Sequence, residues 1–411
     1  MSPAQDKMPV VKKIIDYVKK GEFKFLYNYA KSKGIRGTLG YIALCFRESL
    51  EPTDVIELPS DKINIMFLPN GGLGDCIIAA NYISYFKERY KDYPINIVIV
   101  SKLNFFGPTK AIFETDGDCP IDGIFDNNHH AYAKHYDLVI DLSRYPVINI
   151  CNSEKIQSKC PELIKYVELC EKFRTEHPEI IDGRPFYDGE SAKLCIGLGI
   201  TRIQQPDIYG YFGIDEYYRY PIGVPDKTQV LSKFDLEECD YITIHRGCDA
   251  DYSKDSTKLW PSEYYQTLIN LIKKTYPKVQ IVQLGISHSR CVSFDNTDIN
   301  LIENTTIDDL KILLKYSKIH IDCEGGLVHL RHAMHGGPSV VIFGPTPIDF
   351  YKYSENENIS NNSCPMWCEW ASSTWNDKCV KGHKSPPCMY STTPERVMES
   401  VCKLLGKHSQ Y

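Results

Sequence analysis

The feature that most constrains this chain is an alternation of short apolar runs with amphipathic, helix-like segments, which occurs twice along it. The apolar runs are INIMFLP (63–69), INIVIV (95–100) and YDLVIDLS (136–143), then YITIHRG (241–247), VQIVQLG (279–285), KIHIDCEGG (318–326) and PSVVIFGPT (338–346). Near-continuous apolar strands between helices are typical of parallel sheets that are covered on both faces. We therefore expect two Rossmann-like, doubly wound α/β domains facing a cleft, with ligands at the carboxyl ends of the strands.

The length of the chain supports this division. At 411 residues, it is too long for a single hydrophobic core. We expect a helical N-terminal extension over residues 1–60, a first domain over 61–225 and a second domain over 226–390. A stretch near 200–238 that is rich in Pro, Gly and Tyr marks the crossover, and residues 391–411 contain a final amphipathic helix.

Composition and charge limit the classes of partner. The formal net charge of -6 gives no reason to expect nucleic-acid binding. No apolar run reaches membrane-spanning length. The first 20 residues place lysines inside their apolar stretch, which is not typical of a signal peptide. We expect a cytoplasmic protein whose 16 cysteines are mostly reduced thiols.

Basic residues are concentrated in the N-terminal extension. They are Lys12, Lys13, Lys19, Lys20, Lys24, Lys31, Lys33 and Arg36. One interpretation is a solvated face on helices that pack against the first domain. The other is a surface for an anionic membrane or acceptor, which would place the protein at the inner face of the membrane.

A glycine turn, NGGLGDC (70–76), follows the first apolar run and precedes a helix-like segment at 77–90. Such turns usually cradle phosphate, but this one carries an acid, Asp75. Gly72 and Gly74 let the chain turn sharply and let a ligand come close. Asp75 has a structural explanation, as a cap of the following helix, but a cap alone would not need three glycines.

A second glycine turn predicts a diphosphate site. Gly325 and Gly326 stand between an apolar run and a helix-like segment, so backbone N–H groups and the positive helix end can face an anion. Glu324, His329 and the later FGPT, which contains Thr346, strengthen this prediction. A paired glycine alone would often mark only a tight turn.

Several segments in this order resemble glycosyltransferase family nine, which includes the bacterial heptosyltransferases. They are GGLGDCIIAANYISYFK, YITIHRG, KLWPSEYYQTLI, IVQLG, TTIDDLKILLKYSKIHIDCEGGLVHL and GPTPIDFY. The resemblance implies a GT-B fold and inverting transfer of a sugar from a nucleotide-diphosphate donor, without a catalytic metal. It also implies that the first domain holds the acceptor and the second the donor. In GT-B proteins, a final helix such as that at 391–411 commonly returns to the first domain.

The resemblance also implies roles for individual residues. Asp75 matches the family's general base, with Gly72 and Gly74 on the acceptor side. The donor residues would be Arg246, Lys258, Gly285, Glu324, Gly325, Gly326, His329 and Thr346. Lys258 and Arg246 would neutralise the diphosphate, although a lone basic residue is more often a surface charge. His329 matches a histidine that we expect to pack near the phosphates rather than to act as an acid or base.

The chain also departs from the family pattern. Glu324-Gly325-Gly326 replaces the usual Asp-Thr-Gly, and Ser289 stands where an acid often contacts the ribose. The identities of the nucleotide and the sugar are therefore undecided, and ADP-heptose is a first guess for the donor. The acceptor is a glycan, such as a lipopolysaccharide or capsule precursor, or a protein hydroxyl.

Four cysteines occupy an irregular segment within 360–390: Cys364, Cys368, Cys379 and Cys388. Four thiolates can hold a structural zinc or iron ion, with His383 able to replace one. Their spacing is wider than that of common zinc knuckles, so free thiols and disulfides remain alternatives. The segment resembles the cysteine-rich element of autotransporter heptosyltransferases, where a metal is structural.

Two other functions stay open from the sequence. One is another GT-B enzyme, such as a nucleotide-sugar epimerase. The other is an inactive binding or scaffold protein, for which the altered turn at 324–326 leaves room. A homo-oligomer is also compatible with the sequence.

Overall fold

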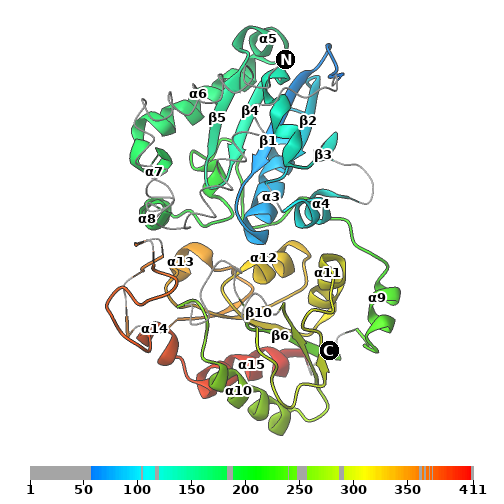
Figure 1. Ribbon diagram of the computed structural model, residues 1–411, viewed down its shortest axis with the longest axis vertical. Coiled ribbons are helices and arrows are strands. Elements are labelled where there is room, and N and C mark those ends of the chain that lie inside the picture. The colour runs from blue at the N-terminus through cyan, green and yellow to red at the C-terminus, as the bar shows by residue number, and fades with distance from the viewer. Residues whose placement is uncertain are drawn as a thin grey trace, which may run out of the picture.

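A computed structural model of the chain describes residues 57–408, except 103–104, 116–119, 183–187, 239, 248–256, 287–290, 361–362, 365–366, 370 and 373. Nearly all of the predicted N-terminal extension, and Ser289, lie outside the described residues. The described part consists of two halves that meet across one boundary (Figure 1).

The first half contains a five-stranded sheet in the order β3-β2-β1-β4-β5. Its strands are β1 (Ile63–Pro69), β2 (Ile95–Val100), β3 (Gly123–Phe125), β4 (Leu138–Leu142) and β5 (Pro146–Cys151). The strands β1, β2 and β4 pair in parallel, as their apolar sequences predict. The sequence did not indicate β5, which is antiparallel to β4 and makes the sheet mixed.

Helices surround this sheet and lead to the second half. They are α3 (Leu73–Arg89), α4 (Phe106–Phe113), the 3₁₀ segment η1 (Asn127–His135), α5 (Ser153–Lys159), α6 (Pro161–Glu176), α7 (Pro178–Asp182) and α8 (Asp188–Gly197). The crossover carries η2 (Gln205–Asp207) and α9 (Lys227–Lys233).

The second half contains a six-stranded parallel sheet in the order β11-β10-β9-β6-β7-β8. Its strands are β6 (Tyr241–His245), β7 (Gln280–Leu284), β8 (Ile299–Asn300), β9 (His320–Cys323), β10 (Ser339–Ile342) and β11 (Glu357–Ile359). Its helices are α10 (Ser262–Thr275), α11 (Ile307–Tyr316), α12 (Gly326–Ala333), α13 (Ile348–Tyr351), α14 (Pro387–Tyr390) and α15 (Pro394–His408). None of the described helices is long and apolar enough to cross a membrane.

The final helix, α15, corrects one expectation. It packs against α10 and β10 of the second half instead of returning to the first domain. Its buried residues Val397, Val401 and Leu404 belong to the core that also contains Ile269 and Ile272 of α10. The apolar stripe of α15 is therefore covered by its own domain, because α10 presents a matching apolar face there.

Both sheets have a topological switch point, where the chain winds outward in opposite directions from two neighbouring central strands. It lies between β1 and β4 in the first sheet and between β6 and β9 in the second. In sheets of this kind, ligands bind outside the carboxyl ends of the strands at that point. The topology therefore selects the residues that follow β1, β4, β6 and β9.

The two switch points face one another through α3 and α12, which pack together across the boundary (Figure 1). A Cβ atom on Gly74 would lie 2.6 Å from the ring of His329, and one on Gly326 would lie 3.1 Å from Leu73. These glycines are needed because any side chain would push the two helix ends apart. The predicted glycine turns of the two domains are therefore brought together.

Candidate functional site

Asp75 lies inside the first turn of α3, because the helix begins at Leu73 rather than near residue 77. Its Oδ2 accepts a hydrogen bond from the backbone N–H of Gly72 at 2.9 Å. The capping explanation therefore describes one oxygen of the carboxylate correctly. The other oxygen is bound by arginines, so capping accounts for only half of the group.

The sequence analysis missed both of these arginines. Nη2 of Arg202 donates to Oδ1 of Asp75 at 2.7 Å, and Nη1 of Arg144 lies 3.5 Å from the same oxygen. Burial alone would raise the pKa of Asp75, but the guanidinium groups of Arg144 and Arg202 outweigh it and lower the pKa to about 2. Asp75 is therefore a carboxylate at every physiological pH.

The position of Arg144 could have been found, since it follows the apolar run that forms β4. Arg202 could not, because it comes from the crossover and carries no motif. Its side chain is buried, and its Nε and Nη1 atoms have no hydrogen-bond partner among the described residues. Its backbone N–H donates to the carbonyl of Phe350 at 2.7 Å, which ties the crossover to the second half.

On the other side of the boundary, Lys258 forms a 2.7 Å ion pair with Glu324. Burial would raise the pKa of Glu324, but the ammonium group of Lys258 lowers it. Two predicted donor residues therefore contact each other, and the carboxylate of Glu324 partly neutralises the charge of Lys258. Thr346, after β10, is buried, and its hydroxyl has no hydrogen-bond partner among the described residues.

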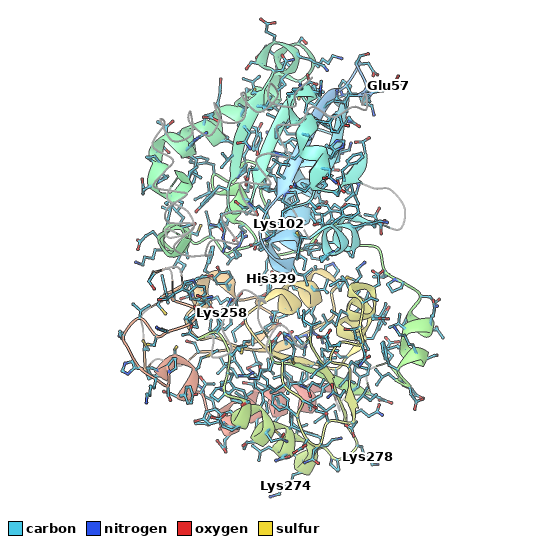
Figure 2. The ribbon with its side chains drawn as sticks, in the orientation of Figure 1. Glu57, Lys102, Lys258, Lys274, Lys278 and His329 are labelled. Atoms are coloured by element: carbon cyan, nitrogen blue, oxygen red, sulfur yellow. The ribbon has the colours of Figure 1, made fainter. Side chains whose placement is uncertain are left out.

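His329 is buried at the level where the two halves meet, and Lys258 lies to one side of it (Figure 2). Its Nδ1 is 2.6 Å from the hydroxyl of Tyr353, and its Nε2 is 4.0 Å from Glu324. Burial lowers the pKa of His329 to about 4, so the imidazole is neutral near pH 7. A neutral, packed ring agrees with the expected role more closely than an acid would.

Two other predicted donor residues stand at strand ends. Arg246 follows β6, and its Nε donates to the carbonyl of Trp260 at 3.1 Å. Gly285 follows β7 with φ at +153°, and a Cβ there would lie 2.4 Å from the sulfur of Cys291. Glycine is required at that position both by its backbone conformation and by lack of space.

Glu369 is a second site residue that the sequence did not indicate. It is buried, and the hydroxyl of Tyr351 donates to both of its carboxylate oxygens, at 2.8 and 3.0 Å. Burial raises the pKa of Glu369 to about 7, although Lys258 and Arg144 act against this rise. Glu369 is next to Cys368 in the sequence. The cysteine-rich segment therefore contributes a carboxyl group close to the charged residues Lys258, Arg144 and Glu324.

A third missed group spans the second switch point. Nδ1 of His245, the last residue of β6, lies 2.8 Å from Oδ2 of Asp322 on β9. Oδ1 of Asp322 accepts from the backbone N–H of Cys323 at 2.7 Å. His320 lies behind, with Nε2 at 3.4 Å from Asp322 and Nδ1 at 3.0 Å from Thr243.

The four predicted metal-binding cysteines are neighbours with free thiols. Burial raises the pKa of Cys368 to about 12, and the thiolates of Cys388, Cys379 and Cys364 contribute to this rise. Among the described residues, however, no group of three or more His, Cys, Asp or Glu side chains has the arrangement of a metal site. The structure has no disulfide at these four residues, so the disulfide alternative is wrong here.

Comparison with solved structures shows the fold. The ADP-heptose lipopolysaccharide heptosyltransferase II of E. coli matches with a TM-score of 0.51 at 14% identity, covering 84% of this chain and 99% of that chain. A family 9 glycosyltransferase from Veillonella parvula gives 0.53 at 14% identity, covering 86% of this chain and 100% of that chain. The iron-containing dodecameric heptosyltransferase TibC, in complex with ADP-D-beta-D-heptose, gives 0.50 at 12% identity, covering 85% and 79%.

No protein-family profile and no curated protein sequence matches the chain. The structural likeness is therefore carried by topology and not by close sequence similarity. The chain has the two-domain GT-B fold of these glycosyltransferases, as the sequence predicted.

Proposed function

We propose that this protein is a glycosyltransferase that moves a sugar from a nucleotide-diphosphate donor to an acceptor hydroxyl with inversion. One observation carries the proposal: the carboxylate of Asp75 stands at the first switch point, directly across the boundary from the glycine turn of the second. Gly74 and Gly326 allow that approach. A base on one side and a phosphate cradle on the other are what in-line displacement at an anomeric carbon requires.

The donor would bind in the second domain. Gly325 and Gly326 open α12 and direct backbone N–H groups toward the diphosphate. Lys258 and Arg246 would add positive charge, and Glu324 would orient Lys258. Thr346, His329 and Gly285 would line the site. ADP-heptose remains the first candidate, because TibC is bound to an ADP-heptose and the E. coli enzyme is named for one.

In the reaction, the acceptor oxygen would form a bond to the anomeric carbon while the bond from that carbon to the phosphate oxygen breaks. The leaving nucleoside diphosphate takes the electron pair, and the acceptor proton moves to Asp75. A carboxylate with a pKa of about 2 is ionised as required but is a weak base. We therefore expect proton transfer to occur late, with Asp75 mainly orienting the hydroxyl.

The acceptor would lie on the side of Gly72 and Gly74. A glycan such as a lipopolysaccharide precursor and a protein hydroxyl both fit a nucleophilic alcohol. The basic residues of the N-terminal extension would favour an anionic acceptor or the inner face of the membrane from the cytoplasm. A homo-oligomer is compatible with the dodecameric description of TibC.

A structural zinc or iron ion would organise the cysteine-rich segment. The four thiols are reduced, and Cys364 and Cys379 contribute to the raised pKa values of Cys368 and Cys388. A cation that binds thiolates would relieve that repulsion. Such an ion would support the segment that carries Glu369 and would take no part in the transfer. Metal analysis should find about one equivalent, lowered by Cys368→Ser but not by Cys151→Ser; less than about half an equivalent would contradict the site.

The function is tested by a thermal-shift screen with ADP, GDP, UDP and CDP, followed by donor turnover. A ligand that binds the native state raises the melting temperature with its affinity and concentration. Asp75→Asn should keep nucleotide binding and lose transfer, whereas the exposed Asp92→Asn should keep both. Sugar release without an acceptor would favour an epimerase-type enzyme, and nucleotide binding without turnover by any variant would favour a scaffold.

A further inference from the structure

The strongest feature that the proposed function leaves unexplained is the pair formed by His245 and Asp322. The two residues belong to β6 and β9, the neighbouring strands between which the order of the second sheet reverses. Because β9 continues into the turn at Glu324 to Gly326, its carboxyl end faces the first domain. The strand β6 runs parallel to it, so His245 ends at the same edge.

The pair has a defined direction. Asp322 is almost completely buried, and its two oxygens are occupied by the backbone N–H of Cys323 and the Nδ1–H of His245. Burial would raise the pKa of Asp322, but His245 and His320 lower it, so it stays a carboxylate that accepts from Nδ1. The ring of His245 is thus held with Nε2 on the side away from Asp322.

The other histidine cannot replace His245 in this role. His320 is fully buried, its Nδ1 is bound to Thr243, and burial lowers its pKa, so it is neutral near pH 7. His245 keeps 13% of its side chain exposed, and its Nε2 has no hydrogen bond to a described residue. A buried carboxylate that accepts from one imidazole nitrogen fixes the ring, and the accessible outer nitrogen can then bind a ligand.

The surroundings of His245 favour an anion. Arg246 is the next residue, and the α12 N-terminus lies at the same edge. Lys258, which pairs with Glu324, stands two residues before Trp260. With a phosphate oxygen at Nε2, both ring nitrogens would face acceptors. Each would then donate an N–H hydrogen bond, one to Asp322 and the other to the phosphate.

We propose that His245, oriented by Asp322, binds the terminal phosphate of the donor's nucleoside diphosphate through Nε2. The proposal rests on the proposed function. As the bond from the anomeric carbon to the phosphate oxygen breaks, the leaving diphosphate gains negative charge, and this hydrogen bond strengthens. The proton stays on His245, and Asp322 is a positioning residue that touches no substrate.

The test compares affinities for a nucleoside diphosphate and its monophosphate by calorimetry, using ADP and AMP or the best-binding pair from the screen. His245→Asn keeps an N–H at the Nδ1 position for Asp322 but has no atom at the Nε2 position. His245→Gln reaches the Nε2 position with an amide N–H. Asp322→Asn tests positioning, and His177→Gln, on a helix end of the first domain, is the control.

His245→Asn should weaken ADP binding about tenfold or more, the loss of one charge-assisted hydrogen bond, and leave AMP binding unchanged. His245→Gln should recover part of that loss. Asp322→Asn should lower the preference for ADP over AMP although His245 is present. Retained AMP affinity shows that each variant is folded.

Two failures are distinguishable. If the wild type binds nucleoside diphosphates and His245→Asn keeps the same preference over the monophosphate, the role of His245 is wrong and the glycosyltransferase proposal stands. If the wild type binds none of the four nucleoside diphosphates, both proposals are wrong.

Discussion

The two switch points of this protein share one topology and carry opposite charge arrangements. At the first, a carboxylate is presented toward the boundary: the side chain of Asp75 is 24% exposed, and that of Arg202 behind it is 2% exposed. At the second, an imidazole is presented: His245 is 13% exposed, and Asp322 behind it is 3% exposed. In the proposed reaction, Asp75 would receive the proton of the acceptor, and His245 would bind the leaving phosphate.

At both switch points the fold supplies a position, and the partner behind each presented residue determines its chemistry. Arg144 and Arg202 keep Asp75 ionised, whereas Asp322 orients His245. Each presented group is held by a buried group of opposite type, and the desolvation cost of that buried group is offset only while the pair is intact.

The largest expected effect is at Asp75, at the first switch point. Asp75→Asn should lower the transfer rate by about a thousandfold, within the range lost when a positioned base is removed. Binding of the nucleoside diphosphate should change little, because Asp75 lies on the other side of the boundary. A kcat lowered to that extent, with unchanged donor affinity, would support the contrast. A kcat within a few-fold of the wild-type value would contradict it.

The ion pair between Lys258 and Glu324 should be the next most sensitive feature. Lys258→Met leaves a buried carboxylate without its ammonium partner, which should destabilise the protein by about 4 kcal/mol. Adding Glu324→Gln should restore much of that loss. Urea unfolding measures the free energy of unfolding of the single and the double variant. Equal values for the two would show that Lys258 and Glu324 are not coupled.

Glu369 should make the protein less stable at higher pH. Its pKa is raised to about 7 in the folded state, so the folded state binds more protons between its ordinary pKa of 4.5 and about 7. Stability should therefore fall as pH rises through that window, by about 3 kcal/mol, and stay low above it. Glu369→Gln should flatten this dependence, and an unchanged slope in urea midpoints would contradict the raised pKa.

The pairing of Asp75 with Arg202 should have a smaller effect on stability, and with the opposite pH dependence: stability should fall as the pH is lowered. The pKa of Asp75 is lowered from 3.8 to about 2, so its contribution is present above about pH 4 and is lost as pH falls toward 2. The loss should be about 2 kcal/mol in the wild type and smaller in Arg202→Gln. Denaturant midpoints at pH 5 and pH 2.5 compare them, with the exposed Arg396→Gln as control.

Much of the fold was predictable because its signals are local. The apolar runs predicted β1 and β2 at the observed bounds, and the run at 241–247 contains β6. Thr306 with Asp309 forms the capping box of α11, which is a local signal as well. The antiparallel strand β5 and the packing of α15 were missed. Both depend on which surface is available to cover an apolar face, and no short segment contains that information.

The sequence by itself determined the two strand–turn–helix series, the glycines that only close backbone approach explains, and the acid in the first turn. The tertiary structure decided which charges meet: Arg202 with Asp75, Glu369 with Tyr351, and His245 with Asp322. These partners are separated by 127, 18 and 77 positions. Patterns of hydrophobicity act over a few residues, whereas a buried charge takes whichever partner the folded chain places within hydrogen-bond distance.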